Sequence, residues 1–404
     1  MKIWLKVGGI LIVAILLVSS MYVVFYSESE EETPDETRDS TDETDETNEE
    51  TDENEQSEDE NEDQEFVHTV FIEEGTATWC NNCPDVAEIL HELYDPDNPE
   101  FYYISLVDDE VEKASNRLSN DYNIFGFPTV FIDGGYEVVM GAKEKSVFEE
   151  KISNALSRNV PRIILNVDAK WNENKSELTV TATLENKEPE TYNGQLKVYI
   201  TEINSRWPDY NGNPYHFAFI DYAMSKNVKV KPDENKSFSE TWTGTYTNIY
   251  PENLWVVAVV FNSDSVQAYS DPPNNEHSFD AYYADAADAV RVAEGCLPPG
   301  IGISSPKKGV RYILGREGKQ TLIGKTLILG KIDITVNVEA DAGVDKIEFI
   351  VKGLLKETKE TIDAEPYEWT WDTTAFGKYT ITVILYDKDG KTATDSIEVL
   401  AIIL

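Results

Sequence analysis

Two of the three cysteines in the chain lie close together, at a spacing that could support thiol chemistry. Cys80 and Cys83 form a C-x-x-C pair between an apolar run at residues 70–72 and a stretch after Pro84 with apolar residues at helical spacing. Two thiols three residues apart can close a small disulfide ring across a strand-to-helix turn. Free N–H groups and aligned peptide dipoles at a helix N-terminus stabilise a thiolate. We therefore expect Cys80 to be the exposed nucleophile and Cys83 to be shielded and to act second.

Residues on either side of the pair extend this pattern. Trp79 directly precedes the first cysteine, and Pro84 directly follows the second. Further along, Phe127 and Pro128 are followed by an apolar run and a Gly-containing turn at residues 129–134. These motifs resemble the thioredoxin superfamily, in which a cis-proline faces the C-x-x-C pair. The bulky Phe127 departs from the smaller residue that this superfamily usually has before the proline.

The resemblance covers residues 66–159 and implies both a fold and a set of site residues. It implies an α/β thioredoxin fold with helices on both faces of a small mixed sheet, and the sequence indicates the order β-α-β-α-β-β-α over residues 66–160. Glu74 matches the place of the superfamily's buried acid. A carboxylate held there would have a raised pKa and could accept the proton of Cys83, unless it is a solvent-exposed acid at a strand end. The expected catalytic residues are Cys80, Cys83, Glu74 and Pro128, and the expected substrate contacts are Trp79 and Phe127.

Other interpretations of the cysteines remain open from the sequence. A structural zinc site would need two further ligands, and only Cys296 and four histidines are available, without a second C-x-x-C. Cys80 and Cys83 could also form an inert, stabilising disulfide. Cys296 has no assured partner, so we expect a free or intermolecular thiol. Residues 387–390 indicate a turn rather than a calcium site, and we expect neither a metal nor a cofactor.

The composition excludes nucleic-acid binding. The chain has 404 residues and a formal net charge of −42, whereas a nucleic-acid-binding protein needs clustered lysines and arginines. It also lacks a glycine-rich phosphate loop. The length suggests about two to four domains.

The N-terminal 65 residues have two distinct parts. The hydrophobic run from Val7 to Phe25 is long enough to cross a hydrocarbon layer of ~30 Å, so residues 1–26 are expected to be a transmembrane signal anchor, with a cleaved signal peptide as the alternative. Two lysines precede this run and acidic residues follow it. The N-terminus is therefore expected in the cytoplasm, and the domains after this single pass outside the cell membrane. Residues 27–65 are expected to be a disordered acidic linker.

The middle of the chain has the composition of β-strands. Residues 161–270 alternate with period two and are separated by Asn-, Gly- and Pro-rich turns, which predicts a β-sandwich. Residues 197–202 and the later Tyr215-His216 resemble the sandwich of a family of outer-membrane-protein-related surface proteins. Residues 271–302 are expected to be a connector, with a short helix at residues 282–294. Two N-x-S sequons make Asn174 and Asn235 candidate glycosylation sites.

The last hundred residues are also rich in strand-forming residues. Residues 366–372 and the later Tyr386-Asp387-Lys388-Asp389-Gly390 resemble bacterial Ig-like repeats of cell-surface proteins. This resemblance implies an Ig-like domain over residues 303–404, and it indicates a fold rather than an activity.

Two functions from different classes follow. In the first, the chain is a membrane-tethered, extracytoplasmic thiol–disulfide oxidoreductase whose partners are protein thiols or disulfides. In the alternative, it is a cell-surface interaction or adhesion protein that binds a partner through its sandwich domains, and its thioredoxin domain is a non-catalytic scaffold.

Overall fold

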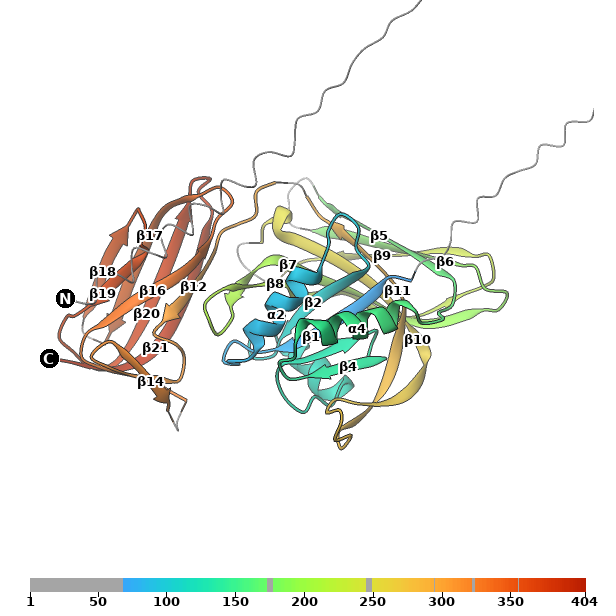
Figure 1. Cartoon of the computed structure of the whole chain (residues 1–404). Coiled ribbons are helices and arrows are strands. Elements are labelled where there is room, and N and C mark those ends of the chain that lie inside the picture. The colour runs from blue at the N-terminus through green and yellow to red at the C-terminus, as the bar shows by residue number, and fades with distance from the viewer. Residues whose placement is uncertain (1–67, 173–176, 245–248, 294, 322–323, 355) are drawn as a thin grey trace, which may run out of the picture. The chain divides into compact units, whose positions relative to one another are not determined.

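The computed structural model describes residues 68–404 except 173–176, 245–248, 294, 322–323 and 355 (Figure 1). The described residues belong to one compact unit. The predicted anchor at residues 1–26 and the predicted acidic linker at residues 27–65 lie outside them.

The first elements of the described chain alternate between strands and helices. Their local order agrees with the predicted β-α-β-α-β-β-α. They are β1 (Val70–Thr76), α2 (Cys83–Leu93), β2 (Phe101–Val107), α3 (Glu112–Asn116), the π-helical turn η1 (Arg117–Asp121), β3 (Thr129–Ile132), β4 (Glu137–Met140) and α4 (Lys145–Leu156).

Seven strands follow, and most of them are long. They are β5 (Ile163–Trp171), β6 (Leu178–Asn186), β7 (Tyr192–Pro208), β8 (Pro214–Val230), β9 (Asn235–Trp242), β10 (Leu254–Tyr269) and β11 (Ser278–Arg291), with the 3-10 turn η2 (Pro251–Asn253) before β10. Because β5 and β6 alternate buried and exposed residues along their length, one face of each packs on a core and the other meets water.

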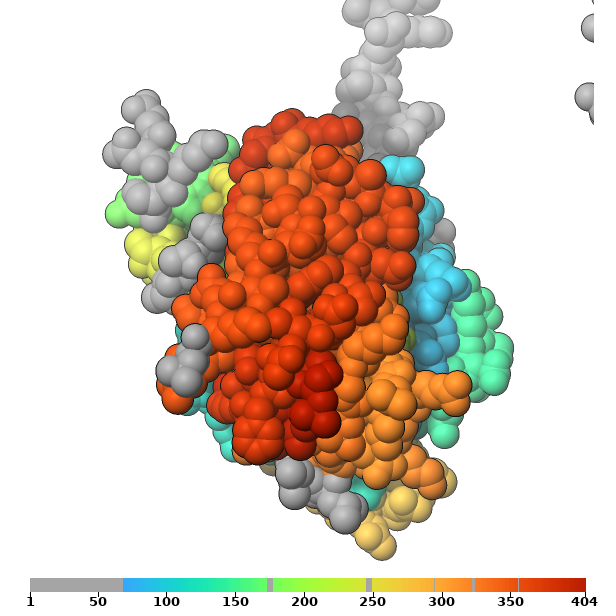
Figure 2. Space-filling model, turned by 90° about the vertical axis from the view of Figure 1, so that its left-hand side faces the viewer, coloured from blue at the N-terminus to red at the C-terminus, as the bar shows by residue number. Residues whose placement is uncertain are grey.

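The C-terminal strands form an Ig-like part of their own, in orange and red in the space-filling view (Figure 2). A three-stranded sheet of order β12-β16-β19 faces a seven-stranded sheet of order β14-β13-β15-β21-β20-β17-β18, and one apolar core lies between them. The strands are β12 (Gly300–Ser305), β13 (Val310–Ile313), β14 (Arg316–Gln320), β15 (Thr326–Leu329), β16 (Ile332–Glu339), β17 (Val344–Gly353), β18 (Glu357–Ile362), β19 (Glu368–Trp371), β20 (Ala375–Asp387) and β21 (Thr392–Ile403).

The predicted fold class is corrected by the way the first four strands pair. They do not form a separate α/β domain, because they continue into an eight-stranded sheet of order β11-β10-β7-β8-β2-β1-β3-β4. The junction is the pairing of Ser105 in β2 with Ala218 in β8. The described chain is therefore nearly all-β and sandwich-like, and the prediction of a free-standing thioredoxin fold is wrong.

The packing of β1–β4 explains this correction. Val70 and Ile72 point to the face that α2 and α4 cover (Figure 1). On the opposite face, Phe71 shares a core with Tyr199 and Phe261 from the sandwich strands, where helices alone were expected. The far side of β7 and β10 packs in turn on the sheet β5-β6-β9. Strands thus bury a surface that a separate domain would have to cover with helices.

Two further expectations differ from the structure. No helix within the described residues is long and apolar enough to cross a membrane, which differs from the expected single-pass anchor and membrane localisation. The helix expected at residues 282–294 is also wrong, since β11 continues to Arg291 and pairs along its length with β10. Tertiary pairing has overridden the helix propensity of its alanines.

The shared core leads to a prediction about residues 66–160. Expressed alone, they would expose Phe71, Ile104 and Phe131, each at a cost of about 1.5–3 kcal/mol. We expect no cooperative thermal transition for residues 66–160, but a sharp one for residues 66–293, which include the covering strands. A cooperative transition in the shorter fragment, followed by near-UV circular dichroism, would contradict the shared core.

Candidate functional site

The structure brings the predicted cysteine residues together. Cys80 and Cys83 form a disulfide with an S–S distance of 2.06 Å at the start of α2. Cys80 is only 5% exposed and Cys83 is fully buried, so the expected exposed nucleophile is not present. Trp79 is exposed and meets Phe127 edge to face, with ring centroids 5.7 Å apart. Phe127 also packs on the apolar cluster of Cys80, Cys83 and Ala77.

Two other predicted site residues lie in or next to neighbouring strands. Pro128 is buried just before β3 and follows Phe127 through a cis peptide bond. Glu74, in β1, is completely buried, and one carboxylate oxygen accepts a hydrogen bond of 2.9 Å from the Ser105 hydroxyl. Burial, opposed by that hydrogen bond, raises the pKa of Glu74 to about 8. The alternative of a solvent-exposed acid at this position is therefore wrong.

The raised pKa of Glu74 predicts a pH-dependent stability. Below pH 4.5 the carboxyl is protonated in both the folded and the unfolded chain, and its contribution to stability is fully present. Between pH 4.5 and about 8 only the unfolded chain releases the proton, which costs up to about 1.4 kcal/mol per pH unit. We expect Glu74→Gln to lose less stability than wild type between pH 5 and 8 in urea denaturation. Parallel losses would contradict the raised pKa.

The remaining predicted residues lie apart from this pair. Cys296 is exposed, and its carbonyl accepts a 2.7 Å hydrogen bond from Lys391. Asn235 is exposed at the start of β9, so its glycosylation stays a prediction, whereas Asn174 lies outside the described residues. The Asp387 carboxylate accepts hydrogen bonds from backbone N–H groups of its own turn, which is the turn expected for residues 387–390. The described residues contain no group of three or more potential metal ligands.

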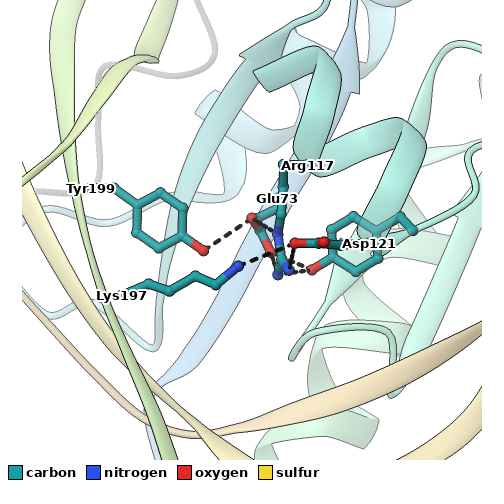
Figure 3. Close-up of polar contacts among 6 residues, drawn as sticks. Glu73, Arg117, Asp121, Lys197 and Tyr199 are labelled. Atoms are coloured by element: carbon teal, nitrogen blue, oxygen red, sulfur yellow. Dashed lines mark hydrogen bonds and ion pairs between the residues drawn. The ribbon is translucent and has the colours of Figure 1, made fainter. Parts of the chain in front are cut away.

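An extensive buried polar cluster around Glu73 was not anticipated. Glu73, the neighbour of Glu74, points to the opposite side of β1 and meets Arg117 of η1 in a two-pronged ion pair, with N–O distances of 3.0 and 2.8 Å (Figure 3). Tyr199 of β7 donates a hydrogen bond of 3.1 Å to the same carboxylate, and Tyr122 donates another. Three separate segments are thereby joined through one carboxylate.

A second carboxylate extends this cluster toward solvent. Asp121 accepts hydrogen bonds from Arg117 at 2.8 Å and from Lys197 of β7 at 3.2 Å (Figure 3). Burial would raise the pKa of Asp121, but the two cations outweigh burial and lower it. Burial and the neighbouring Arg117 lower the pKa of Lys197 to about 8. The sequence offers one signal for this cluster, the carboxylate of Glu73 directly after the apolar run at residues 70–72. The structure shows that every residue of that strand, β1, is buried.

The cluster predicts a large cost for removing its arginine. Arg117→Met would leave Glu73 buried without its counter-ion, a loss of about 3–5 kcal/mol in the free energy of unfolding. The control is Lys145→Met, which breaks an exposed ion pair with Glu92 and should cost less than about 1 kcal/mol. Equal midpoints for the two variants in urea denaturation would show that the buried pair is not a structural link.

The outer face of the seven-stranded sheet carries an apolar row. Ile313 pairs with Leu329, Leu329 with Ile402, and Ile402 with Phe376, so the four side chains lie on one face of four neighbouring strands. Phe376 is 83% exposed, and Ile313 and Ile402 are also exposed. Leu314, in the turn after β13, is 71% exposed. We call these five residues the apolar row.

Comparison with protein families gives one match, to a bacterial Ig domain at residues 323–383. The matched residues begin just before β15 and end within β20, inside the region expected to be Ig-like. They are a small part of the chain and identify one domain only. No curated protein sequence matches the chain.

Two solved structures illustrate the distant likeness that the comparison found. A protein from Agrobacterium tumefaciens is 10% identical with a TM-score of 0.35, and the alignment covers 57% of this chain and 97% of that one. Fibronectin(III)-like modules of Clostridium thermocellum CbhA are 15% identical with a TM-score of 0.21, covering 59% of this chain and 94% of theirs. TM-scores this low do not indicate a shared function.

These findings correct the main interpretation drawn from the sequence. The nearly all-β fold and the bacterial Ig match contradict a thioredoxin-superfamily oxidoreductase with a redox-active centre at Cys80 and Cys83. They also leave the resemblance to outer-membrane-protein-related proteins without support. The findings agree better with the alternative, a surface or adhesin-type interaction protein.

Proposed function

We propose that the chain is a surface or adhesin-type interaction protein that binds a protein partner through its Ig-like part. The observation that carries this proposal is the apolar row on the outer face of the seven-stranded sheet. Exposed apolar side chains that adjoin one another mark interaction surfaces, whereas single exposed ones are ordinary. The apolar row has four side chains in register across four neighbouring strands, so it is a group of adjoining apolar side chains.

The surroundings of the row favour a protein as the partner. Two residues along each strand, the same face carries Arg311 paired with Leu327, and Leu400 paired with Lys378. Lys378 also forms an exposed ion pair of 2.6 Å with Glu398. The apolar residues are therefore bordered by charges of both signs. An apolar centre with a mixed polar rim is the usual anatomy of a protein–protein interface.

The region of residues 66–160 acts as a scaffold in this proposal. Its disulfide is buried, and both faces of its strands are packed, by α2 and α4 on one side and by sandwich strands on the other. The Glu73–Arg117 pair then ties this region to β7. Such a packed region can hold other parts of the chain in place.

The apolar row can be tested by introducing a charge. The assay measures binding of the labelled full chain to the surface of the cells that produce it. Phe376→Glu should weaken this binding by about ten-fold or more, because the contact would bury a carboxylate among apolar side chains. The matched control is Leu354→Glu, which changes an exposed leucine of the Ig-like part outside the row and should leave binding within about two-fold.

The scaffold role is tested in the same assay. The double variant Cys80→Ser and Cys83→Ser, once shown to be folded, should bind as wild type does, because the disulfide does not contact the row. Binding that fails in this variant, or that survives Phe376→Glu unchanged, would contradict the proposal.

A further inference from the structure

A large cavity adjoins the Glu73–Arg117 cluster. Its volume is about 890 Å³, within the range of several hundred to about a thousand Å³ that is typical of small-molecule sites. Arg117 and Lys197 are part of its lining. Its walls come from η1 and the following residues, and from strands β7, β8, β10 and β11.

The walls of the cavity are rich in amide side chains. An amide both donates and accepts hydrogen bonds, as a sugar hydroxyl does, so the two groups are matched partners. Most binding sites for apolar ligands have few such groups, whereas this cavity has six. They are Asn120, Asn123, Asn193, Gln195, Asn227 and Asn262.

Two of these amides are available for a ligand. Gln195 of β7 and Asn227 of β8 are directly paired across the two strands, so their side chains lie next to each other on the cavity face. Neither side chain has a hydrogen-bond partner among the described residues, and neither is buried. Asn123 and Asn262, in contrast, already donate to Ser278 and Asp285. Gln195 and Asn227 are therefore free to bind hydroxyl groups.

The charges of the cavity balance. Three cations and three carboxylates lie in its lining or directly beneath it, in a chain whose formal net charge is −42. Such a site offers no net attraction to a phosphate or a polyanion. The charged residues are Arg117, Lys197 and Lys229, with Glu73, Asp121 and Asp280.

An aromatic ring completes the lining. Tyr282 of β11 is 42% exposed and borders the cavity, while Phe279 and Phe261 lie deeper in its wall. The backbone of Tyr282 passes so close to Gly134 that a Cβ atom there would lie 2.1 Å from the Tyr282 oxygen, so β11 is held against the turn after β3. A partly exposed ring on a strand held in this way can pack against the C–H face of a pyranose.

We propose that this cavity binds a neutral saccharide. The paired amides of Gln195 and Asn227 bind its hydroxyl groups, and the ring of Tyr282 packs against a sugar face. The proposal does not depend on the apolar row, because no cavity residue belongs to the Ig-like part. A failure of one proposal therefore leaves the other standing.

The test is calorimetric titration of the full chain with neutral tetrasaccharides built of glucose, mannose or galactose, and with tetramers of uronic acid. We expect saturable binding of at least one neutral tetrasaccharide. The double variant Gln195→Ala and Asn227→Ala should weaken that binding by about 30-fold, as expected for two lost hydrogen bonds. Gln320→Ala, which removes an exposed strand amide of the Ig-like part, should leave it within about two-fold.

Three outcomes would overturn the proposal: no binding of any neutral tetrasaccharide, binding of the uronic acid tetramers alone, or a folded double variant that binds as wild type does. If the double variant does not fold, Asn227→Ala decides the question, because that residue is exposed. It should weaken binding by about five-fold, and unchanged binding would overturn the proposal.

Discussion

The ion pair between Glu73 and Arg117 is the constraint on which the central part of the molecule depends. A buried carboxylate is costly unless it is paired and hydrogen-bonded, and this one receives Arg117 from η1, Tyr199 from β7 and Tyr122. These partners fix how β1 lies against the sandwich strands. The same pair holds Arg117 in the lining of the cavity, so the structural link and the proposed saccharide site share one cluster.

The sequence predicted much of the local structure but not how its parts combine. Helical spacing after Pro84 and the strands at β1, β2 and β3 were recognised correctly, because each depends on residues close in the chain. The sequence could not show that Phe71 would pack on Phe261, since nothing local distinguishes an apolar side chain covered by a helix from one covered by a strand. The wrong fold class follows from this gap.

The candidate site shows the same limit in two adjacent residues. The sequence motif pointed to Glu74, which is buried and whose pKa is raised by that burial, yet Glu73 is the residue that joins three segments. Successive residues of a strand point to opposite faces, so their surroundings are unrelated. Gln195 and Asn227 also carried no signal in the sequence, because their proximity arises only from the register of β7 and β8.

The contrast between buried and exposed groups decides which features can take part in binding. The disulfide of Cys80 and Cys83 has the residue types of a reactive site, but its sulfur atoms lie within a packed cluster. The apolar row has no reactive group at all, and it consists of residues that would be expected in a core. Exposing such side chains to water is unfavourable and does not help the chain to fold. A partner that covers them removes this unfavourable contribution. The position of side chains relative to solvent, rather than their chemical type, therefore favours an interaction protein over an oxidoreductase.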